Sequence, residues 1–271
     1  MRLRLAELAP APGDLGRNLD RLEKVVRAGP ADLAVFPELF LSGYRVGDRF
    51  HTLAVREADT TLPRLRALAG ETGCGIAVGA PRASPTRRGE VENVVLVAAP
   101  DGHLGVQIKR YLPTFGPFEE GIVFTPTDRS LPIALGERRI GFEICYDTFF
   151  PEVSRDLALG GAEIVVVVSA SPVTSRRLFE RLLPARAIEN GLPVVYVNRV
   201  GVEDGLVFGG GSAAWDARGE PMVLERRTVE GLAAEESVLE VEVDPHESGR
   251  WRPFRPVLRD VSSRPGPLGP A

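Results

Sequence analysis

The sequence predicts an α/β fold in which a mixed sheet, or two sheets, are flanked by helices. Apolar runs on either side of a helix-like segment occupy residues 139–169, a pattern typical of a βαβ unit. Turn signals at residues 100–102 and 216–219 indicate hairpins, so other strands pair antiparallel. Apolar side chains at helical spacing in residues 13–29 predict a helix that covers a sheet.

The remaining elements follow from local patterns. A short buried strand is predicted over residues 31–38, closed by Pro37, and a second helix over residues 61–70, ended by a glycine-rich stretch. Later strands alternate with helices and turns. We expect strands at 75–80, 93–98, 104–109, 139–145, 163–169 and 192–198, helices at 151–159 and 177–190, and a hairpin that pairs 212–215 with 221–225.

The domain organisation is predicted to be simple. No internal repeat or linker interrupts residues 1–245, which are interpreted as one domain. Residues 246–271 are rich in proline, and we expect them to form an extended arm that packs on the body or on a second subunit.

Composition excludes several function classes. The 271 residues carry a net charge of -4, so a basic surface for nucleic acid is not expected. The start of the chain lacks the apolar stretch of a signal peptide, and the longest apolar run, residues 164–168, is too short to span a membrane. Cys74 and Cys145 form neither a disulfide framework nor a metal-ligand spacing, which predicts a cytoplasmic thiol protein with no metal or cofactor.

Three predicted strands end in a chemically reactive side chain: Glu38, Lys109 and Cys145. A carboxylate base, a lysine and a thiol together favour acyl-transfer chemistry. Cys145 precedes a helix-like segment, where backbone N–H groups can hold a developing negative charge. The plainer alternative for Cys145 is a small buried hydrophobe, which is also our interpretation of Cys74.

Each of the other two residues also has a structural alternative. Glu38 lies among apolar neighbours, which raise a carboxyl pKa toward a range useful for proton transfer, but it could instead pair with an arginine. Lys109 could be a solvated lysine at a strand end. Only Lys24 and Lys109 are lysines among the 33 Lys and Arg residues, which favours a specific need for a compact ammonium at Lys109. The three histidines lie in loop or tail contexts, so a papain-like Cys–His pair is not favoured.

Taken together, three ordered motifs resemble those of the nitrilase superfamily of carbon–nitrogen hydrolases. They are Phe-Pro-Glu at 36–38 followed by Gly-Tyr at 43–44, Lys-x-x-Leu-Pro at 109–113 followed by Phe-x-Glu at 118–120, and Gly-x-x-Ile-Cys-Tyr-Asp-x-x-Phe-Pro-Glu at 141–152. The resemblance covers roughly residues 2–245 and includes the Gly-Gly-Gly-Ser run at 209–212.

The resemblance implies a four-layer α-β-β-α sandwich and a catalytic triad of Glu38, Lys109 and Cys145. It further implies that Glu120 is a supporting active-site glutamate, that the Tyr146 backbone N–H stabilises an oxyanion, and that the chain forms a homodimer or a higher oligomer. The substrate would be a small amide. Tyr44, Asp147 and Arg176 are expected to contact it.

The branch within the superfamily is less sharply indicated. True nitrilases carry a tryptophan-glutamate pair after the cysteine, whereas Tyr146 and Asp147 follow here, which is more similar to the amidase branches. Arg176 leaves a carbamoyl-amino-acid hydrolase open, because a guanidinium binds a carboxylate in a bidentate way. The early stretch is also similar to the glutaminase domain of glutamine-dependent NAD synthetases.

Two interpretations from other classes remain. One is a non-catalytic or partner-dependent module of the same fold. The other is a redox-sensing thiol at Cys145, which ranks last because it gives Glu38 no purpose.

Overall fold

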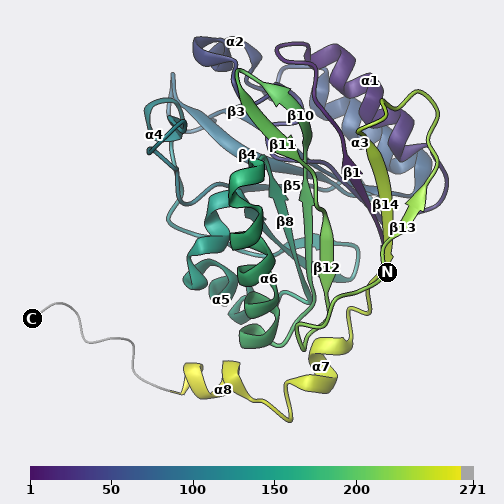
Figure 1. Ribbon diagram of the computed structural model, residues 1–271, viewed down its shortest axis with the longest axis vertical. Coiled ribbons are helices and arrows are strands. Elements are labelled where there is room, and N and C mark those ends of the chain that lie inside the picture. The colour runs from purple at the N-terminus through teal and green to yellow at the C-terminus, as the bar shows by residue number, and fades with distance from the viewer. Residues whose placement is uncertain (264–271) are drawn as a thin grey trace, which may run out of the picture.

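The computed structural model describes residues 1–263. In that part of the chain, two sheets pack face to face between two pairs of helices (Figure 1), which confirms the four-layer arrangement. The seven-stranded sheet has the order β13-β14-β1-β2-β3-β4-β5, and the five-stranded sheet has the order β12-β9-β8-β7-β6. A separate two-stranded sheet pairs β10 with β11.

The seven-stranded sheet consists of β1 (Arg2–Glu7), β2 (Leu33–Val35), β3 (Gly75–Ala83), β4 (Val91–Ala98), β5 (Leu104–Ile108), β13 (Glu225–Arg227) and β14 (Ser237–Glu242). The other strands are β6 (Ile133–Leu135), β7 (Arg138–Ile144), β8 (Ile164–Ser169), β9 (Val194–Asn198), β10 (Val200–Glu203), β11 (Leu206–Gly209) and β12 (Ala213–Trp215). The longer helices are α1 (Leu15–Val26), α3 (Thr61–Thr72), α5 (Pro151–Leu159) and α6 (Arg176–Asn190). Short helical turns are η1 (Gly47–Arg49), α2 (Phe50–Leu53), α4 (Glu120–Val123), η2 (Cys145–Phe149), η3 (Val173–Ser175), α7 (Glu247–Trp251) and α8 (Val257–Ser262).

Alternation along the strands builds the layers. In β7, Ile140, Phe142 and Ile144 point into the core between the sheets, while the residues between them face α5. Strands β8 and β9 are buried on both faces, which explains their unbroken apolar runs. Helices α1 and α3 cover the outer face of the seven-stranded sheet.

Strand direction decides where the reactive residues lie. Strands β1, β2 and β3 are parallel to one another, as are β7, β8 and β9. Strand β5 runs antiparallel to β4, which is antiparallel to β3, so β5 points the same way as β2 and β3. The carboxyl ends of these strands therefore lie at one end of their sheet.

The second expected hairpin forms only in part. Its turn is present, with Gly219 N–H donating to the Asp216 carbonyl. After it, Pro221 bridges Trp215 and the Met222 N–H donates to the Ala214 carbonyl at 2.8 Å, but within residues 1–263 the ladder extends no further. The chain then crosses to the seven-stranded sheet, where Arg226 in β13 pairs with Leu239 in β14.

The expectation of an extended arm after residue 245 is wrong for the residues that the structure describes. Residues 247–262 contain the helices α7 and α8 instead. Arg252 donates to the Ala162 carbonyl, and Leu258 packs beside the apolar cluster under α5 and α6. Residues 264–271 of the predicted arm lie outside the described part. Among the helices of residues 1–263, none is both long and apolar enough to cross a bilayer.

Candidate active site

The three reactive residues follow the carboxyl ends of three strands. Glu38 comes shortly after β2, Lys109 directly after β5, and Cys145 directly after β7. Two of these strands belong to one sheet and the third to the other. The bond between Lys109 and Glu38 joins the ends of β5 and β2, and the Tyr111 N–H, which donates to Asp147, joins the ends of β5 and β7. The sandwich thus brings residues that are distant in sequence to one edge.

Lys109 lies between two carboxylates. Its Nζ is 2.6 Å from Glu38 Oε1 and 2.7 Å from Glu120 Oε1, and all three side chains are buried. Burial by itself lowers the pKa of Lys109, but the charges of Glu120 and Glu38 outweigh it and raise that pKa. Lys109 is therefore an ammonium at neutral pH.

Asn93 in β4 organises the same carboxylates, and sequence reasoning missed it. Its Nδ2 donates to Glu38 Oε1 at 2.9 Å and to Glu120 Oε2 at 3.3 Å. The second oxygen of Glu38 accepts the Ala170 N–H at 2.9 Å. The available signal in the sequence was the position of Asn93 inside the strand Val91–Ala98, because an amide buried in a strand needs hydrogen-bond partners.

Tyr44 acts on Glu120. Its hydroxyl donates to Glu120 Oε1 at 2.6 Å, and the phenol ring is buried. Burial is the main cause that raises the pKa of the Tyr44 hydroxyl well above 10.0, and the charges of Glu120 and Glu38 add to it. The hydroxyl therefore stays protonated and remains a hydrogen-bond donor. Direct contact of Tyr44 with a substrate stays a prediction.

Cys145 has an unusual backbone conformation. Its φ of 49° lies in the left-handed region, which a residue with a Cβ adopts at a cost of about 1–3 kcal/mol. It is partly exposed, unlike Cys74, which is buried. Burial, followed by the charge of Glu38, raises the pKa of Cys145, while Lys109 opposes the shift. The thiol is therefore protonated at rest and needs a base before it can attack.

Asp147 holds the turn that carries Cys145. Its Oδ1 accepts the N–H groups of Arg110 at 3.1 Å and Tyr111 at 2.8 Å, and its Oδ2 accepts the Ile144 N–H at 3.2 Å. The expectation that Asp147 contacts substrate is therefore wrong: its fully buried oxygens face backbone groups, and it ties the Cys145 turn to the Lys109 segment. Burial is the largest cause that raises the pKa of Asp147 to about 7.

A second buried carboxyl supports the turn from below. Glu143 accepts hydrogen bonds from Thr148 Oγ1 at 3.1 Å and from Ser154 Oγ in α5. Arg186 in α6 donates from Nε to the Thr148 carbonyl at 2.9 Å. Burial raises the pKa of Glu143, which favours a neutral acid there. The turn is thus fixed from both sides, as a strained conformation requires.

Arg176 lies apart from the triad. Its exposed side chain is 2.9 Å from Glu180 and lines a cavity of about 160 Å³ together with Tyr196 and Asn198. Tyr196 lies close to both this cavity and Cys145. Burial is the largest cause that raises the pKa of Tyr196, and the charge of Cys145 is the next. A substrate role for Arg176 stays a prediction.

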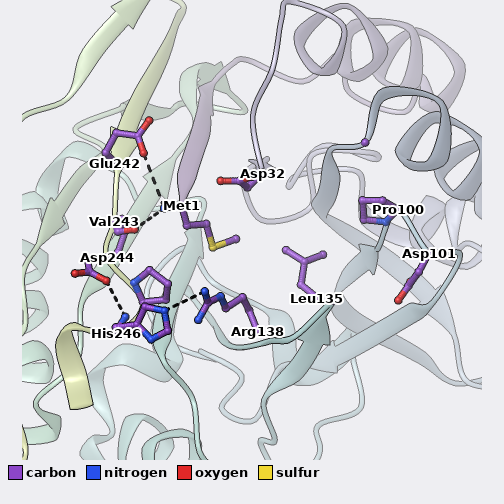
Figure 2. Close-up of a pocket in the computed structure, with 13 residues that line it drawn as sticks. Met1, Asp32, Pro100, Asp101, Leu135, Arg138, Glu242, Val243, Asp244 and His246 are labelled. Atoms are coloured by element: carbon purple, nitrogen blue, oxygen red, sulfur yellow. Dashed lines mark hydrogen bonds and ion pairs between the residues drawn. The ribbon is translucent and has the colours of Figure 1, made fainter. Parts of the chain in front are cut away.

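A larger hollow of about 780 Å³ lies at the opposite end of the strands (Figure 2). Its lining includes Met1, Asp32 and Arg138, which precede or begin strands. Several of its polar groups already pair with one another, such as the Met1 amine with the Val243 carbonyl at 2.8 Å and Arg138 with the His246 ring at 3.2 Å. None of the triad lines it. Within residues 1–263, no group of three or more His, Cys, Asp or Glu side chains is arranged to hold a metal ion.

The model of the carbon-nitrogen hydrolase family matches residues 2–253. The chain belongs to the carbon–nitrogen hydrolase family. This result confirms the resemblance drawn from the three motifs and agrees with the position of Cys145, Lys109 and Glu38 at one edge of the sandwich.

The relatives of this chain within the carbon–nitrogen hydrolase family are named for different activities. The chain is 35% identical to an (R)-stereoselective amidase of Pseudomonas sp, over 81% of this chain and 78% of the relative. It is 33% identical to a glutamine-dependent NAD(+) synthetase of Thermotoga maritima, over 99% of this chain but only 46% of that protein. Among solved structures, a cysteine-to-alanine mutant of the amidase from Nesterenkonia sp. AN1 in complex with butyramide is 29% identical, with a TM-score of 0.77 over 96% of this chain and 93% of that chain.

Proposed function

We propose that the protein hydrolyses the C–N bond of a small amide to a carboxylic acid and ammonia through a thioester on Cys145. The observation that carries the proposal is the buried Glu38–Lys109–Glu120 array, whose charges act on the neighbouring Cys145 thiol. The amidases among the relatives support it, and so does the butyramide complex of the Nesterenkonia amidase.

The first half-reaction follows from the charges. Glu38 accepts the thiol proton, and the Cys145 sulfur forms a bond to the amide carbonyl carbon while the C–O π electrons move to oxygen. Lys109 and the Tyr146 N–H stabilise this oxyanion, and one such donor contributes about 10²–10³ in rate. Glu38 then gives its proton to the nitrogen, the C–N bond breaks, and ammonia leaves.

Hydrolysis of the thioester reverses these roles. Glu38 takes a proton from water, and the hydroxide adds to the thioester carbon. The C–S bond then breaks to release the acid, and Glu38 returns its proton to the departing sulfur. Lys109 remains cationic throughout, because its pKa is raised by the two neighbouring glutamates despite its burial. It is therefore an electrostatic stabiliser and not a proton carrier.

A second candidate is glutamine hydrolysis that supplies ammonia to a partner protein. The alignment with the NAD(+) synthetase of Thermotoga maritima over 99% of this chain favours it. Carbamoyl and nitrile substrates, a homodimeric assembly and a cytoplasmic location remain predictions from the sequence.

The test measures ammonia release from simple amides, glutamine and a carbamoyl amino acid. We expect turnover of at least one simple amide by the intact chain and none above background by Cys145→Ala or Glu38→Gln. Near-native turnover by either variant would overturn the mechanism. Turnover of glutamine alone would favour the second candidate.

A further inference from the structure

A buried ion pair lies next to the active-site array, and the proposed mechanism does not use it. Arg199 comes directly after β9, and Glu203 is the last residue of β10. The two side chains pair with each other, and both residues are buried. A buried ion pair contributes little net stability, because the removal of both charges from water largely offsets their attraction. Stability alone is therefore a poor reason for placing both charges here.

Glu203 contacts the segment that carries Tyr44. Its Oε1 accepts the Tyr44 N–H at 3.0 Å and the Arg45 N–H at 2.8 Å. Gly43 permits this close approach, since a Cβ at that position would lie only 2.9 Å from Oε1 of Glu203. Glu203 therefore fixes the backbone from which the Tyr44 hydroxyl donates to Glu120 at 2.6 Å.

Arg199 supports the same tyrosine from the side of its ring. The guanidinium carbon of Arg199 lies 4.2 Å from the centroid of the Phe208 ring, a cation–π contact. The Phe208 ring in turn packs edge-on against the Tyr44 ring, with 6.4 Å between the two centroids. The ion pair thus restricts Tyr44 twice, because Glu203 holds its backbone and Arg199 holds the ring beside it.

The backbone of Arg199 is also linked to the other carboxylate of the array. Its N–H donates to the Ser169 carbonyl at 3.3 Å, and the next residue, Ala170, donates its N–H to Glu38 at 2.9 Å. Burial lowers the pKa of Arg199, and the charges of Glu203 and Glu38 oppose that shift. One ion pair therefore borders the segments that hold both carboxylates of the array.

We propose that Glu203 is a positioning residue that keeps the Tyr44 hydroxyl on Glu120. Arg199 fixes the direction in which the Glu203 carboxylate points, and the Tyr44 donor favours the ionised form of Glu120. An ionised Glu120 holds the Lys109 ammonium in the place where it stabilises the oxyanion. The inference rests on the proposed amide hydrolysis and adds to it a residue that acts through Tyr44.

The test is a double-mutant cycle on ammonia release from the simple amide that the intact chain turns over fastest. It compares Glu203→Gln, Tyr44→Phe and the two combined. Each single variant should lower kcat by about 10- to 100-fold, because a small displacement near the reacting groups is costly. The combined variant should be no slower than the slower single one. Losses that multiply, or an unchanged kcat in Glu203→Gln, would overturn the proposal.

The pH dependence of kcat separates positioning from a loss of stability. Burial raises the pKa of Glu120, and the charge of Lys109 opposes that shift. The charge of Glu38 also raises this pKa, whereas the Tyr44 hydrogen bond lowers it. Loss of the Tyr44 donor should therefore move the acidic limb of kcat upward by about one pH unit, in Tyr44→Phe and in Glu203→Gln alike. A limb at the same pH as in the intact chain would overturn the proposal.

The matched control is Asp204→Asn. Asp204 is the neighbour of Glu203 and lies 2.9 Å from Arg45 on the same segment, but its side chain is 67% exposed. An exposed pair of this kind contributes little, so kcat and the acidic limb should not change. If Glu203→Gln does not fold, Arg199→Lys takes its place, because lysine keeps the buried charge but lacks the flat group that lies over Phe208. It should shift the limb in the same direction, and an unchanged profile would overturn the proposal.

Failure of this proposal and failure of the proposed function give different results. If the intact chain releases ammonia but the losses multiply, Glu203 only stabilises the fold, and amide hydrolysis stands. If the intact chain releases no ammonia from any amide, the proposed function fails, and the role of Glu203 fails with it.

Discussion

Lys109 is the residue on whose charge the rest of the site depends. Its ammonium touches two buried carboxylates, and a planar guanidinium would not fit the same compact position. In Lys109→Met, volume is kept but Glu38 and Glu120 are left as adjacent buried acids, so one of them is expected to hold a proton. We expect kcat to fall by at least about 10².

Ammonia release measures this change, with circular dichroism to show that the variant is folded. The matched control is Lys24→Met, the other lysine of the chain, which is exposed on α1 and should leave kcat unchanged. A Lys109→Met enzyme with normal kcat would contradict the assigned role of the ammonium.

The thiol of Cys145 offers a test of its two charged neighbours. Burial raises the pKa of Cys145, and the charge of Lys109 opposes that shift. Lys109→Met should therefore slow alkylation by iodoacetamide at about pH 8, because it removes the charge that stabilises the thiolate. Glu38→Gln should also slow alkylation, because the protonated thiol loses the base that accepts its proton. Alkylation of either variant at or above the rate of the unmodified chain would contradict this account.

At the scale of elements, two buried acids, Asp147 and Glu143, hold the turn η2. Asp147 makes the stability of the folded chain depend on pH. The pKa of Asp147 is raised from 3.8 to about 7, chiefly by burial. Because the folded state has the higher pKa, protonation of Asp147 contributes stability that is complete below about pH 4 and is lost as the pH rises through 7. A shift of this size corresponds to about 4 kcal/mol.

Asp147→Asn should remove this dependence. We expect the wild-type Tm to fall more than the variant's Tm between about pH 5 and pH 8, as measured by calorimetry. Glu143 and Glu120, whose pKa values are also raised by burial, are present in both proteins, so the comparison isolates Asp147. Equal slopes in the two proteins would show that Asp147 is ionised in the fold.

The sequence predicts the elements that carry the triad and not the contacts that hold them. Glu38, Lys109 and Cys145 could be found because each ends a strand with a clear apolar pattern. Asn93 and Glu143 were missed, since a polar residue inside a strand reveals its partner only when the neighbouring strands and helices are placed. Asp147 was misassigned because adjacency to Cys145 in sequence does not reveal that the side chain turns toward backbone N–H groups.

At the scale of the whole molecule, α5 and α6 form the outer layer that covers the five-stranded sheet (Figure 1). Leu159, Leu178 and Ile188 are all exposed there, and they fit the predicted homodimer. Leu159→Glu combined with Leu178→Glu should shift sedimentation toward a single subunit of 29.3 kDa. The control is Ile122→Glu, an exposed apolar residue on α4. A wild-type chain that sediments as a monomer would contradict the dimer.

Long-range pairing limits what local patterns can establish about the whole molecule. The four-layer order came from the family resemblance, because alternating strands and helices are compatible with one mixed sheet or with two. The chain after Trp215 joins the other sheet at β13, which the turn at residues 216–219 could not indicate. The short helices α7 and α8 have too few turns to produce a clear periodic signal.

The most direct test of the central claim is intact-mass analysis of the chain, quenched shortly after mixing with butyramide. The account predicts a species heavier by one butyryl group, located on the peptide that contains Cys145 and absent from Cys145→Ala. Ammonia release without any acyl adduct, together with turnover by Cys145→Ala, would contradict it.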